Sequence, residues 1–394
     1  MRKKVCIGDL GTIVTGNTPP RNRPELYGNH TPFIKATDIS ESEKYTYNPE
    51  ECYSEEGYNK YIKSLIPKGS TCVVTIGSIG KKMTMAHCDL FINQAMNAII
   101  PNACFDSEYV YYAVKNVLGN IKTLDSGTAS GRENVSKSAF SKMEIWVEEE
   151  LPIQHRIATI LSRYDSLIEN YQKQIKLLEE SAQRLYKEWF IDLRFPGHEN
   201  TKIVDGVPEG WEKKSIANLG TYLNGFAFKP SDWQETGKPI IKIKEMGNGI
   251  STDTPRNNGE RVPEKYLIKS GDLLFSWSAT LMVIVWTGED GWLNQHIFKV
   301  MPAQGVGREF LLQSISRTIA EFSNLTTGST MKHIQRNKLE QVFVNTPTSE
   351  IMNCYCRIAE RLREQILNIS SQIRHLTEAR DRLLPKLMSG EIEV

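Results

Sequence analysis

Residues 157–189, with the sequence IATILSRYDSLIENYQKQIKLLEESAQRLYKEW, carry the pattern that decides the fold. Apolar residues recur there every seven positions in two interleaved rows, and charged residues lie between the rows. This spacing predicts a helix whose apolar stripe packs against another helix. No Pro or Gly occurs from Ile153 to Phe195. We therefore expect a helix of about 40 residues, which would be about 60 Å long.

A second stretch with the same spacing lies in the last part of the chain, and we expect it to form the partner helix. Pro385 predicts the end of this helix, which leaves Leu387 just past it. Arg380 occupies a seam position, where we expect its stem to pack while its charge reaches water. The alternative interpretation is two ordinary amphipathic helices in separate cores. The predicted seam residues are Leu161, Tyr164, Ile168, Tyr171, Ile175, Leu178 and Leu185 in the first helix, and Leu362, Ile366, Ile369, Ile373, Leu376 and Leu383 in the second.

The composition indicates a globular protein of two or three domains. The chain has 394 residues, of which 24% are charged and 40% hydrophobic, and a formal net charge of +1. Such a charge neither requires nor excludes a nucleic-acid partner, so any basic surface must be local. No apolar run is long enough to span a bilayer, and no apolar signal core follows the basic first residues. The seven cysteines show no disulfide or zinc spacing, which favours a reduced, cytoplasmic protein.

The chain contains an internal repeat with an offset of about two hundred residues. An acidic residue follows the second matched segment in both copies, at Asp38 and Glu245. The matched segments are 9–16 with 218–225, 33–35 with 240–242, 91–94 with 292–295, 156–158 with 357–359, and 184–185 with 382–383. Their order predicts a domain, a helix, a second domain and a second helix, at residues 1–150, 151–195, 196–350 and 351–394.

Within each domain, short apolar runs next to Gly predict strands, and longer amphipathic segments predict helices. This mixture predicts an α+β fold for both domains. Because the ends of a compact domain often lie close together, the second long helix should return along the first. We therefore expect two similar α+β domains separated by an antiparallel coiled coil and related by an approximate two-fold axis. Strands are expected at 71–76, 97–100, 272–277 and 298–301, and helices at 108–117 and 309–319.

The whole chain resembles the specificity subunits of type I restriction-modification systems. The resemblance rests on the duplicated domain and helix plan, together with Asn-Gln pairs at 93–94 and 294–295. It also rests on the sequences PEGW at 208–211 and GSTMKHI at 328–334. The first domain departs from this pattern, because it has GTASGR at 127–132 and no Pro-Glu-Gly-Trp opening. The order and duplication of these motifs, rather than any one of them, make the resemblance specific.

The resemblance implies a function. Each domain would be a target recognition domain that reads one part of a split sequence in double-stranded DNA. The paired helices would hold the domains at a fixed separation and dock two modification subunits. Those subunits would carry the adenine methyltransferase chemistry and bind S-adenosylmethionine, and a restriction or motor subunit would use Mg and ATP. The chain itself would bind no cofactor and no metal.

Residues that could contact DNA are amides, hydroxyls and basic side chains in loops after strands, because these groups bind phosphates and base edges. Residues 77–82, GSIGKK, predict a Gly-permitted turn that presents amides and lysines to phosphates, with a plain solvated turn as the alternative. Asn93 and Gln94 are expected to satisfy buried backbone groups instead. The tryptophans expected in cores are Trp277, Trp286 and Trp292. The candidates are Lys35, Thr37, Ser78, Lys81, Lys82, Ser130 and Arg132 in the first domain, and Lys242, Lys244, Ser276, Ser278, Ser329, Lys332, His333 and Arg336 in the second.

No motif in the sequence predicts catalysis by this chain. Residues 75–82 lack the first Gly and the final hydroxyl residue of a phosphate-binding loop. Residues 17–20, NTPP, interrupt the Asn-Pro-Pro order with which adenine methyltransferases hold a flipped base. The histidines show no metal-ligand spacing. Two other functions stay open, namely a coiled-coil scaffold that binds only proteins and an enzyme with a scattered active site.

Overall fold

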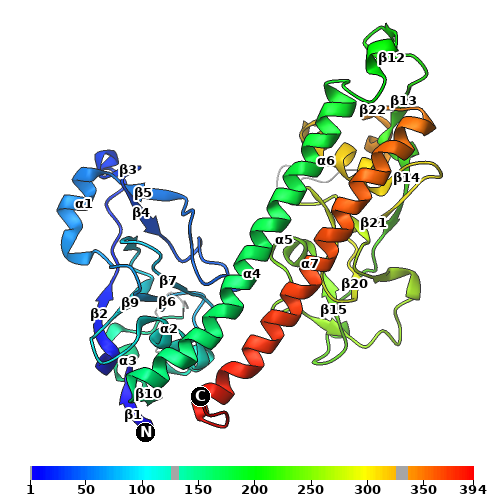
Figure 1. Cartoon of the computed structure of the whole chain (residues 1–394). Coiled ribbons are helices and arrows are strands. Elements are labelled where there is room, and N and C mark those ends of the chain that lie inside the picture. The colour runs from blue at the N-terminus through cyan, green and yellow to red at the C-terminus, as the bar shows by residue number, and fades with distance from the viewer. Residues whose placement is uncertain (1, 126–132, 325–335) are drawn as a thin grey trace. The chain divides into compact units, whose positions relative to one another are not determined.

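Two long helices, α4 and α7, form the predicted coiled coil (Figure 1). The computed structural model describes residues 2–125, 133–324 and 336–394. Helix α4 extends over Leu151–Tyr186 and is followed by one π-helical segment, Lys187–Ile191. Helix α7 extends over Ser349–Ser389. The absence of Gly from both segments and their unbroken apolar stripes account for this length.

The chain divides into two units, and both long helices contribute to each of them. Unit 1 contains Met1–Asn170 and His375–Val394, whereas unit 2 contains Tyr171–Arg374. In unit 1 the first part of α4 pairs with the last part of α7, as in the contact of Asp165 with Arg380. In unit 2 the last part of α4 pairs with the first part of α7. The helices are therefore antiparallel, and the prediction of a coiled coil is confirmed.

The seam residues lie on the packed faces of the two helices. All the residues of the predicted seam are buried or half-buried. Leu161, Ile168 and Ile366 are the most buried of them, with exposed fractions of 0%, 4% and 1%. By contrast, Leu177 of α4 lies off the seam and is 62% exposed. The seven-residue period thus separates the packed side chains of α4 from the solvated ones.

Helix α7 does not end at Pro385, so this prediction was wrong. The helix continues to Ser389, and Pro385 lies inside it. Proline removes one backbone hydrogen bond, at a cost of about 3 kcal/mol in a helix interior. Leu384, Leu387 and Met388 are nevertheless buried in the core of unit 1, and this burial requires the final turn to stay helical. Tertiary packing therefore outweighs the local preference.

The first domain, in unit 1, contains one antiparallel sheet and one mixed sheet. One has the strand order β2-β9-β6-β7 and the other has the order β3-β5-β4-β8, in which β4 and β8 are parallel. A separate antiparallel pair, β1 with β10, connects the ends of the domain. The strands are β1 (Arg2–Cys6), β2 (Gly11–Thr15), β3 (Tyr27–Gly28), β4 (Thr31–Ile34), β5 (Glu51–Tyr53), β6 (Thr71–Val74), β7 (Met83–Met85), β8 (Phe91–Ile92), β9 (Met96–Pro101) and β10 (Glu144–Glu148). The helices are α1 (Glu55–Tyr61), α2 (Ser107–Asn116) and α3 (Lys137–Lys142).

The second domain, in unit 2, has the same plan. Its sheets have the orders β14-β21-β18-β19 and β16-β15-β20-β17, with β15 parallel to β20, and β13 pairs with β22. The strands are β11 (Ile203–Val204), β12 (Val207–Pro208), β13 (Glu212–Ser215), β14 (Gly220–Asn224), β15 (Lys238–Ile241), β16 (Arg256–Asn257), β17 (Leu267–Ile268), β18 (Leu273–Ser276), β19 (Met282–Val285), β20 (Gly291–Leu293), β21 (Ile297–Pro302) and β22 (Phe343–Thr346). The helices are α5 (Ile243–Asn248) and α6 (Arg308–Asn324). The predicted α+β class and internal repeat are both confirmed.

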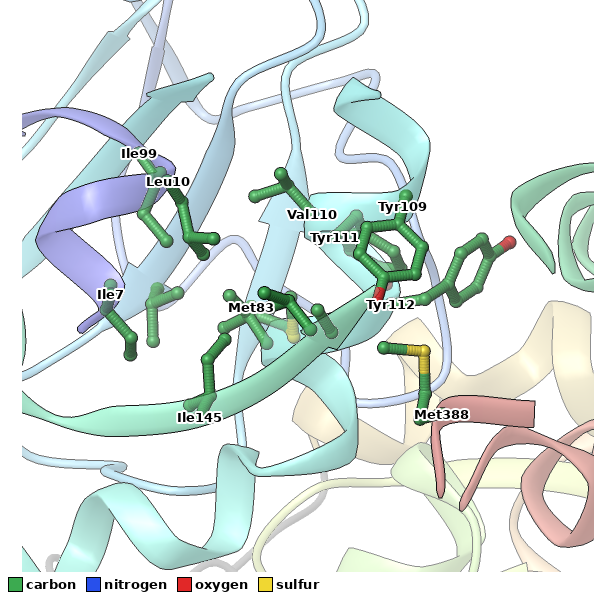
Figure 2. Packing of buried hydrophobic residues seen from close by; sticks show 14 of the residues in the cluster. Ile7, Leu10, Met83, Ile99, Tyr109, Val110, Tyr111, Tyr112, Ile145 and Met388 are labelled. Carbon is green, nitrogen blue, oxygen red and sulfur yellow. The ribbon is translucent and has the colours of Figure 1, made fainter. Parts of the chain in front are cut away.

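The core of unit 1 joins the first domain to both long helices. Helix α2 buries Tyr109 and Tyr112, strand β10 buries Ile145, and α4 buries Leu161. Figure 2 shows α2 and β10 side chains in this core together with Met388 of α7. Because the domain and the helix pair share one apolar cluster, neither packs independently of the other in this unit.

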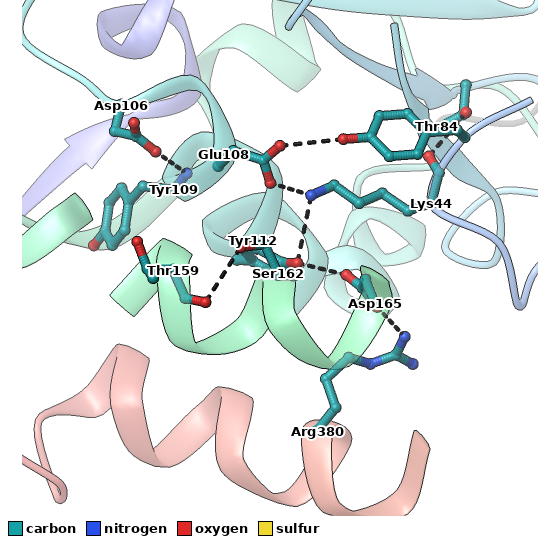
Figure 3. Close-up of polar contacts among 11 residues, drawn as sticks. Lys44, Thr84, Asp106, Glu108, Tyr109, Tyr112, Thr159, Ser162, Asp165 and Arg380 are labelled. Atoms are coloured by element: carbon teal, nitrogen blue, oxygen red, sulfur yellow. Dashed lines mark hydrogen bonds and ion pairs between the residues drawn. The ribbon is translucent and has the colours of Figure 1, made fainter. Parts of the chain in front are cut away.

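A buried polar cluster lies beside this core (Figure 3). Arg380 donates from Nη1 to Asp165 Oδ1 at 2.5 Å, and the Tyr112 hydroxyl donates to Asp165 Oδ2 at 2.5 Å. Arg380 is only 4% exposed. The prediction that its charge reaches water was therefore wrong, because Asp165 supplies a buried countercharge that the seven-residue pattern did not reveal.

Lys115 of α2 lies close to the same cluster. Burial lowers the pKa of its ammonium group to about 8, and the positive charge of Arg380 acts in the same direction. The folded protein therefore binds fewer protons than the unfolded chain between about pH 8 and the ordinary lysine pKa of about 10.4. Stability should rise with pH across this window.

We expect Leu161→Ala to lower the free energy of unfolding by about 2–5 kcal/mol, because it leaves a cavity in the core of unit 1. Leu177→Ala is the matched control on the same helix, since Leu177 is 62% exposed. The control should change stability by no more than about 0.5 kcal/mol. Urea unfolding followed by circular dichroism measures both, and equal shifts in the midpoint would contradict the assigned packing.

We expect Lys115→Met to stabilise the protein at pH 7, because it removes a charge that burial disfavours and keeps the apolar stem. The gain should shrink as the pH rises from about 8 to about 10.4, where the wild-type ammonium loses its charge. Urea midpoints measured at several pH values test this, with Lys142→Met at an exposed position as the control. A loss of stability at pH 7 would show that the ammonium group is favourably bound.

Candidate nucleic-acid interface

In the first domain, the loops that follow β4 and β6 lie together. The backbone N–H of Lys35 donates to Asp38 Oδ2 at 2.8 Å, which closes the first loop. Lys82 Nζ then donates to the carbonyl oxygen of Ala36 at 3.3 Å and so joins the two loops. Thr37 is exposed at this edge. The structure thus brings together candidates that are separated by about forty residues in sequence.

The second of these loops, residues 77–82, is the Gly-permitted turn that its sequence predicts. Gly77 has φ of 91° and Gly80 has φ of 76°, values that other residues rarely adopt. The Gly77 N–H donates to the Glu133 carbonyl oxygen at 3.1 Å. Ser78 at the tip is exposed. The backbone after residue 132 is therefore anchored directly beside this turn.

Acidic neighbours partly neutralise the basic residues of this edge. Lys35 Nζ binds Glu50 and lies 3.6 Å from Glu51 Oε2. The hydrogen bond with Glu50 raises the pKa of Lys35. Arg21 donates to both carboxylate oxygens of Glu51, at 2.6 and 3.1 Å, and this bond lowers the pKa of Glu51. A phosphate at Lys35 would therefore have to displace an acidic partner.

The second domain repeats the hydrogen bond that closes the first loop, but there the segment begins helix α5. The Lys242 N–H donates to Glu245 Oε2 at 3.1 Å, as Lys35 does to Asp38. Glu245 is buried and also accepts from Thr254 Oγ1 at 3.1 Å. The matched acids therefore accept from equivalent backbone N–H groups, although the segment is a turn in the first domain and the start of α5 in the second. Lys242 lies with Nζ 4.4 Å from the centre of the Trp233 ring, and Lys244 Nζ lies 3.0 Å from Asp253.

Two of the candidate serines have structural positions instead of surface ones. Ser276 is fully buried, accepts from the Met282 N–H at 2.9 Å and donates to the Thr280 carbonyl oxygen at 2.5 Å. Ser278 is 2% exposed. Neither hydroxyl is available to DNA here, so their assignment as contacts is corrected. The hydroxyl of Ser276 closes the turn between β18 and β19, a role that the sequence did not distinguish from surface exposure.

The side chains of six candidates are not described by the structure. Arg336 begins a short 3-10 helix, Arg336–Glu340, and only its backbone is described. Ser130, Arg132, Ser329, Lys332 and His333 lie outside the described residues.

A basic hollow of about 450 Å³ in the first domain was missed in the sequence. Lys60, Lys63 and Lys137 line it, together with the amide of Asn17. All three lysines are exposed. The sequence signal was the alternation of lysines and an aromatic residue at 60–63, KYIK, but only tertiary packing brings Lys137 to it. A concave surface with three ammonium groups suits a phosphate backbone.

The side chains of Asn93 and Gln94 do not satisfy buried backbone, so that prediction was wrong. Gln94 is exposed and accepts a hydrogen bond from the Thr18 hydroxyl. Asn93 Oδ1 is buried without a hydrogen-bond partner in the part of the chain that the structure describes. The backbone N–H of Asn93 instead donates to the Ile34 carbonyl oxygen at 3.0 Å. This bond extends the parallel pairing of β4 with β8.

The tryptophans follow the core prediction in two cases of three. Trp286 and Trp292 are 3% and 7% exposed, and both donate their indole N–H to backbone carbonyl oxygens. Trp277 is half-buried and donates to Asn224 Oδ1 at 3.1 Å. Its ring therefore lies at the edge of the second core, next to the turn after β18.

The chemistry of the described residues offers no assembled metal site. No cluster of three or more His, Cys, Asp or Glu side chains with metal-binding geometry occurs within residues 2–125, 133–324 and 336–394. The cysteines form no disulfide. Within the same ranges, no helix is both long and apolar enough to cross a bilayer. The polar features that remain are the loop edges and the basic hollow.

Comparison with known proteins identifies the family. The family model for the type I restriction modification DNA specificity domain matches the chain twice, at residues 2–180 and 208–376. The MjaIX specificity subunit of Methanocaldococcus jannaschii is 26% identical over 98% of this chain and 93% of its own length. The HindI specificity subunit of Haemophilus influenzae is 30% identical over 47% of this chain and 42% of its own length.

A solved structure has the same fold. The S subunit of a type I restriction-modification system from M. genitalium superposes with a TM-score of 0.54 at 16% identity. The superposition covers 98% of this chain and 96% of the other. Together with the two matches to the family model, the duplicated fold shows that this chain belongs to the type I restriction-modification specificity subunits.

Proposed function

We propose that this specificity subunit reads a two-part, asymmetric target in double-stranded DNA, with one recognition domain for each part. The proposal rests on one backbone hydrogen bond that occurs in both domains next to side chains that differ. Asp38 and Glu245 accept from the equivalent backbone N–H groups of Lys35 and Lys242, but the residues that follow these lysines differ. Two similar backbone arrangements that carry different side chains suit two different half-sites.

Base-edge chemistry supports reading by such loops. Amides and hydroxyls can pair with adenine, and lysine or arginine can pair with guanine, in the major groove. Most polar contacts in DNA complexes nevertheless go to phosphates and fix the register of the protein. In the first domain we assign phosphate contact to Lys81, Lys82 and the lysines of the basic hollow. We assign base contact to the exposed tips at Thr37 and Ser78.

We further propose that the helix pair docks two modification subunits. An exposed apolar side chain, Leu177, lies on α4 beside a shallow groove that Leu178 and Ile369 help to line. Such a surface suits helices of a partner protein. The modification subunits would supply the adenine methyltransferase chemistry and S-adenosylmethionine, and a restriction or motor subunit would bring Mg and ATP. This chain would contribute recognition and no catalysis.

We expect Lys81→Ala/Lys82→Ala to weaken DNA binding by the chain with its modification partner for all sequences alike. Each lost phosphate contact should reduce the slope of log affinity against log salt by about 1. The preferred target sequence should not change, because phosphate contacts carry no base information. Fluorescence anisotropy over a range of salt concentrations measures the affinity and the slope.

The control for this experiment is Lys3→Ala/Lys4→Ala. These lysines lie on β1 and pair with Glu149 and Glu144. The control changes the net charge equally and should leave the salt slope unaltered. Equal losses in both variants would indicate a general charge effect. Salt-insensitive binding by the wild type would favour a scaffold without DNA recognition.

We expect a seven-residue insertion in each long helix to widen the gap between the two target parts. The insertions belong after Asn170 and before His375, where the two units divide, so that the apolar seam stays in phase. Seven residues add about 10 Å of helix. At about 3.4 Å per base pair, this corresponds to about three additional base pairs in the gap.

Methylation-aware sequencing of host DNA measures the gap directly. A two-part methylated motif should be present with the wild-type chain, absent without it, and more widely spaced with the insertions. A motif of unchanged spacing would contradict the role of the helices as a spacer. A single continuous motif would contradict the proposal of two separate readers.

A further inference from the structure

The buried ion pair of Asp165 with Arg380 joins the two halves of the repeat, residues 1–195 and 196–394. Asp165 is 8% exposed and Arg380 is 4% exposed. Their 2.5 Å contact connects α4 of the first half to α7 of the second (Figure 3). Tyr112 of the first domain binds the other carboxylate oxygen at 2.5 Å, and Arg380 Nη2 lies 2.8 Å from Asp381 Oδ1. Both charges are therefore held in one arrangement.

The equivalent positions in unit 2 are apolar. The match of 156–158 with 357–359 makes Ile366 the counterpart of Asp165. The match of 184–185 with 382–383 makes Ala182 the counterpart of Arg380. Ala182 and Ile366 are each 1% exposed, so the two pairs of positions have the same burial. At these equivalent positions the seam is charged in unit 1 and apolar in unit 2, where the nearby buried Arg363 pairs with Glu309 of its own half.

The first match has an offset of 201 and the second an offset of 198, and the helix ends support the second offset. Leu384, Leu387 and Met388 at the end of α7 are buried in unit 1. At the spacing set by 184–185 and 382–383, their counterparts are Tyr186, Trp189 and Phe190, and all three are buried in unit 2. The comparison of Asp165 and Arg380 with apolar positions is therefore a comparison of equivalent sites.

This difference makes pairing between like halves unfavourable. In an antiparallel pair of two first-half helices, Asp165 would face Ala182 of the other copy. In a pair of two second-half helices, Arg380 would face Ile366. In the first arrangement Asp165 would lose Arg380 and keep only the neutral Tyr112 hydroxyl. In the second Arg380 would lose its buried countercharge and keep only the exposed Asp381. Pairing of unlike halves instead gives one charged pair of positions and one apolar pair.

We propose that Asp165 and Arg380 form a pairing code, through which the long helix of each half accepts the other half and rejects a copy of itself. The inference concerns assembly and holds whatever DNA the domains read. Replacing a buried ion pair with apolar residues is often neutral or stabilising, whereas removing one partner is strongly destabilising. The code therefore acts on the choice of partner, and it should disfavour like pairs by roughly a hundredfold or more.

The test uses the full chain, folded first and then cut. A protease site is inserted in the exposed turn at Asp205–Gly206, which joins β11 and β12. The cut protein is held in sub-denaturing urea, returned to buffer and weighed by native mass spectrometry. The masses distinguish unlike pairs from like pairs of either half. We expect the wild type to give only unlike pairs.

The decisive variant copies the apolar layer, as Asp165→Ile/Arg380→Ala. It should fold, and like pairs should appear at more than ten times the wild-type detection level. The matched control is Glu378→Ile/Arg382→Ala, which removes an exposed ion pair of 2.5 Å from the same helix. This control should keep only unlike pairs. Like pairs in the wild type, or their absence from the apolar variant, would overturn the proposal.

A second variant tests the code by adding a charge. Ile366→Asp gives Arg380 a partner in a pair of two second halves and leaves an unpaired carboxylate in the unlike pair. Pairs of second halves should therefore appear with this single substitution, whereas pairs of first halves should not. If Ile366→Asp yields only unlike pairs, the charges do not choose the partner, even if the apolar variant fails to fold.

Discussion

Burial of one apolar stripe on a long helix is the constraint on which this molecule depends. Helix α4 presents its apolar residues every seven positions, and a single domain covers only part of such a stripe. The rest requires a second helix with the same period, which α7 provides from the other half of the chain. Each unit is therefore built from both halves, and its core contains a domain together with segments of both helices. The duplication of the sequence is the direct means of satisfying this constraint.

The two domains show which features a duplicated frame keeps and which it changes. The sheet orders, the parallel pairs β4–β8 and β15–β20 and the acid that closes the first loop are the same in both copies. The loop tips, the tryptophan content and the polar layer of the seam differ. Features held by backbone geometry are thus shared, whereas side chains at the loop tips, in parts of the core and in the seam have diverged. This is the division expected of a protein that presents two unlike surfaces on one scaffold.

Much of the fold could be predicted because it is periodic or repeated. The seven-residue spacing located α4 and α7, and the repeat located the equivalent strands. The errors arose where tertiary contacts outweigh local pattern. Pro385 stays helical because its neighbours are buried, and Arg380 stays buried because Asp165 lies opposite to it. The site was less predictable, because exposure of a loop residue depends on packing. Ser276 is enclosed by its own turn, and the basic hollow combines Lys60 and Lys63 with the distant Lys137.

In each domain a glycine, Gly16 or Gly225, lies where two backbone segments cross closely. This crossing limits which residues can replace the glycine. A side chain at Gly16 would approach the Ile92 carbonyl oxygen to 2.2 Å, and one at Gly225 would approach the Asn294 carbonyl oxygen to 2.1 Å. Neither position tolerates even a methyl group without separating the chain segments that cross there. Substitutions are therefore tolerated less well at the crossing than at the loop tips. The side chains of the loops can therefore change while both glycines stay in place.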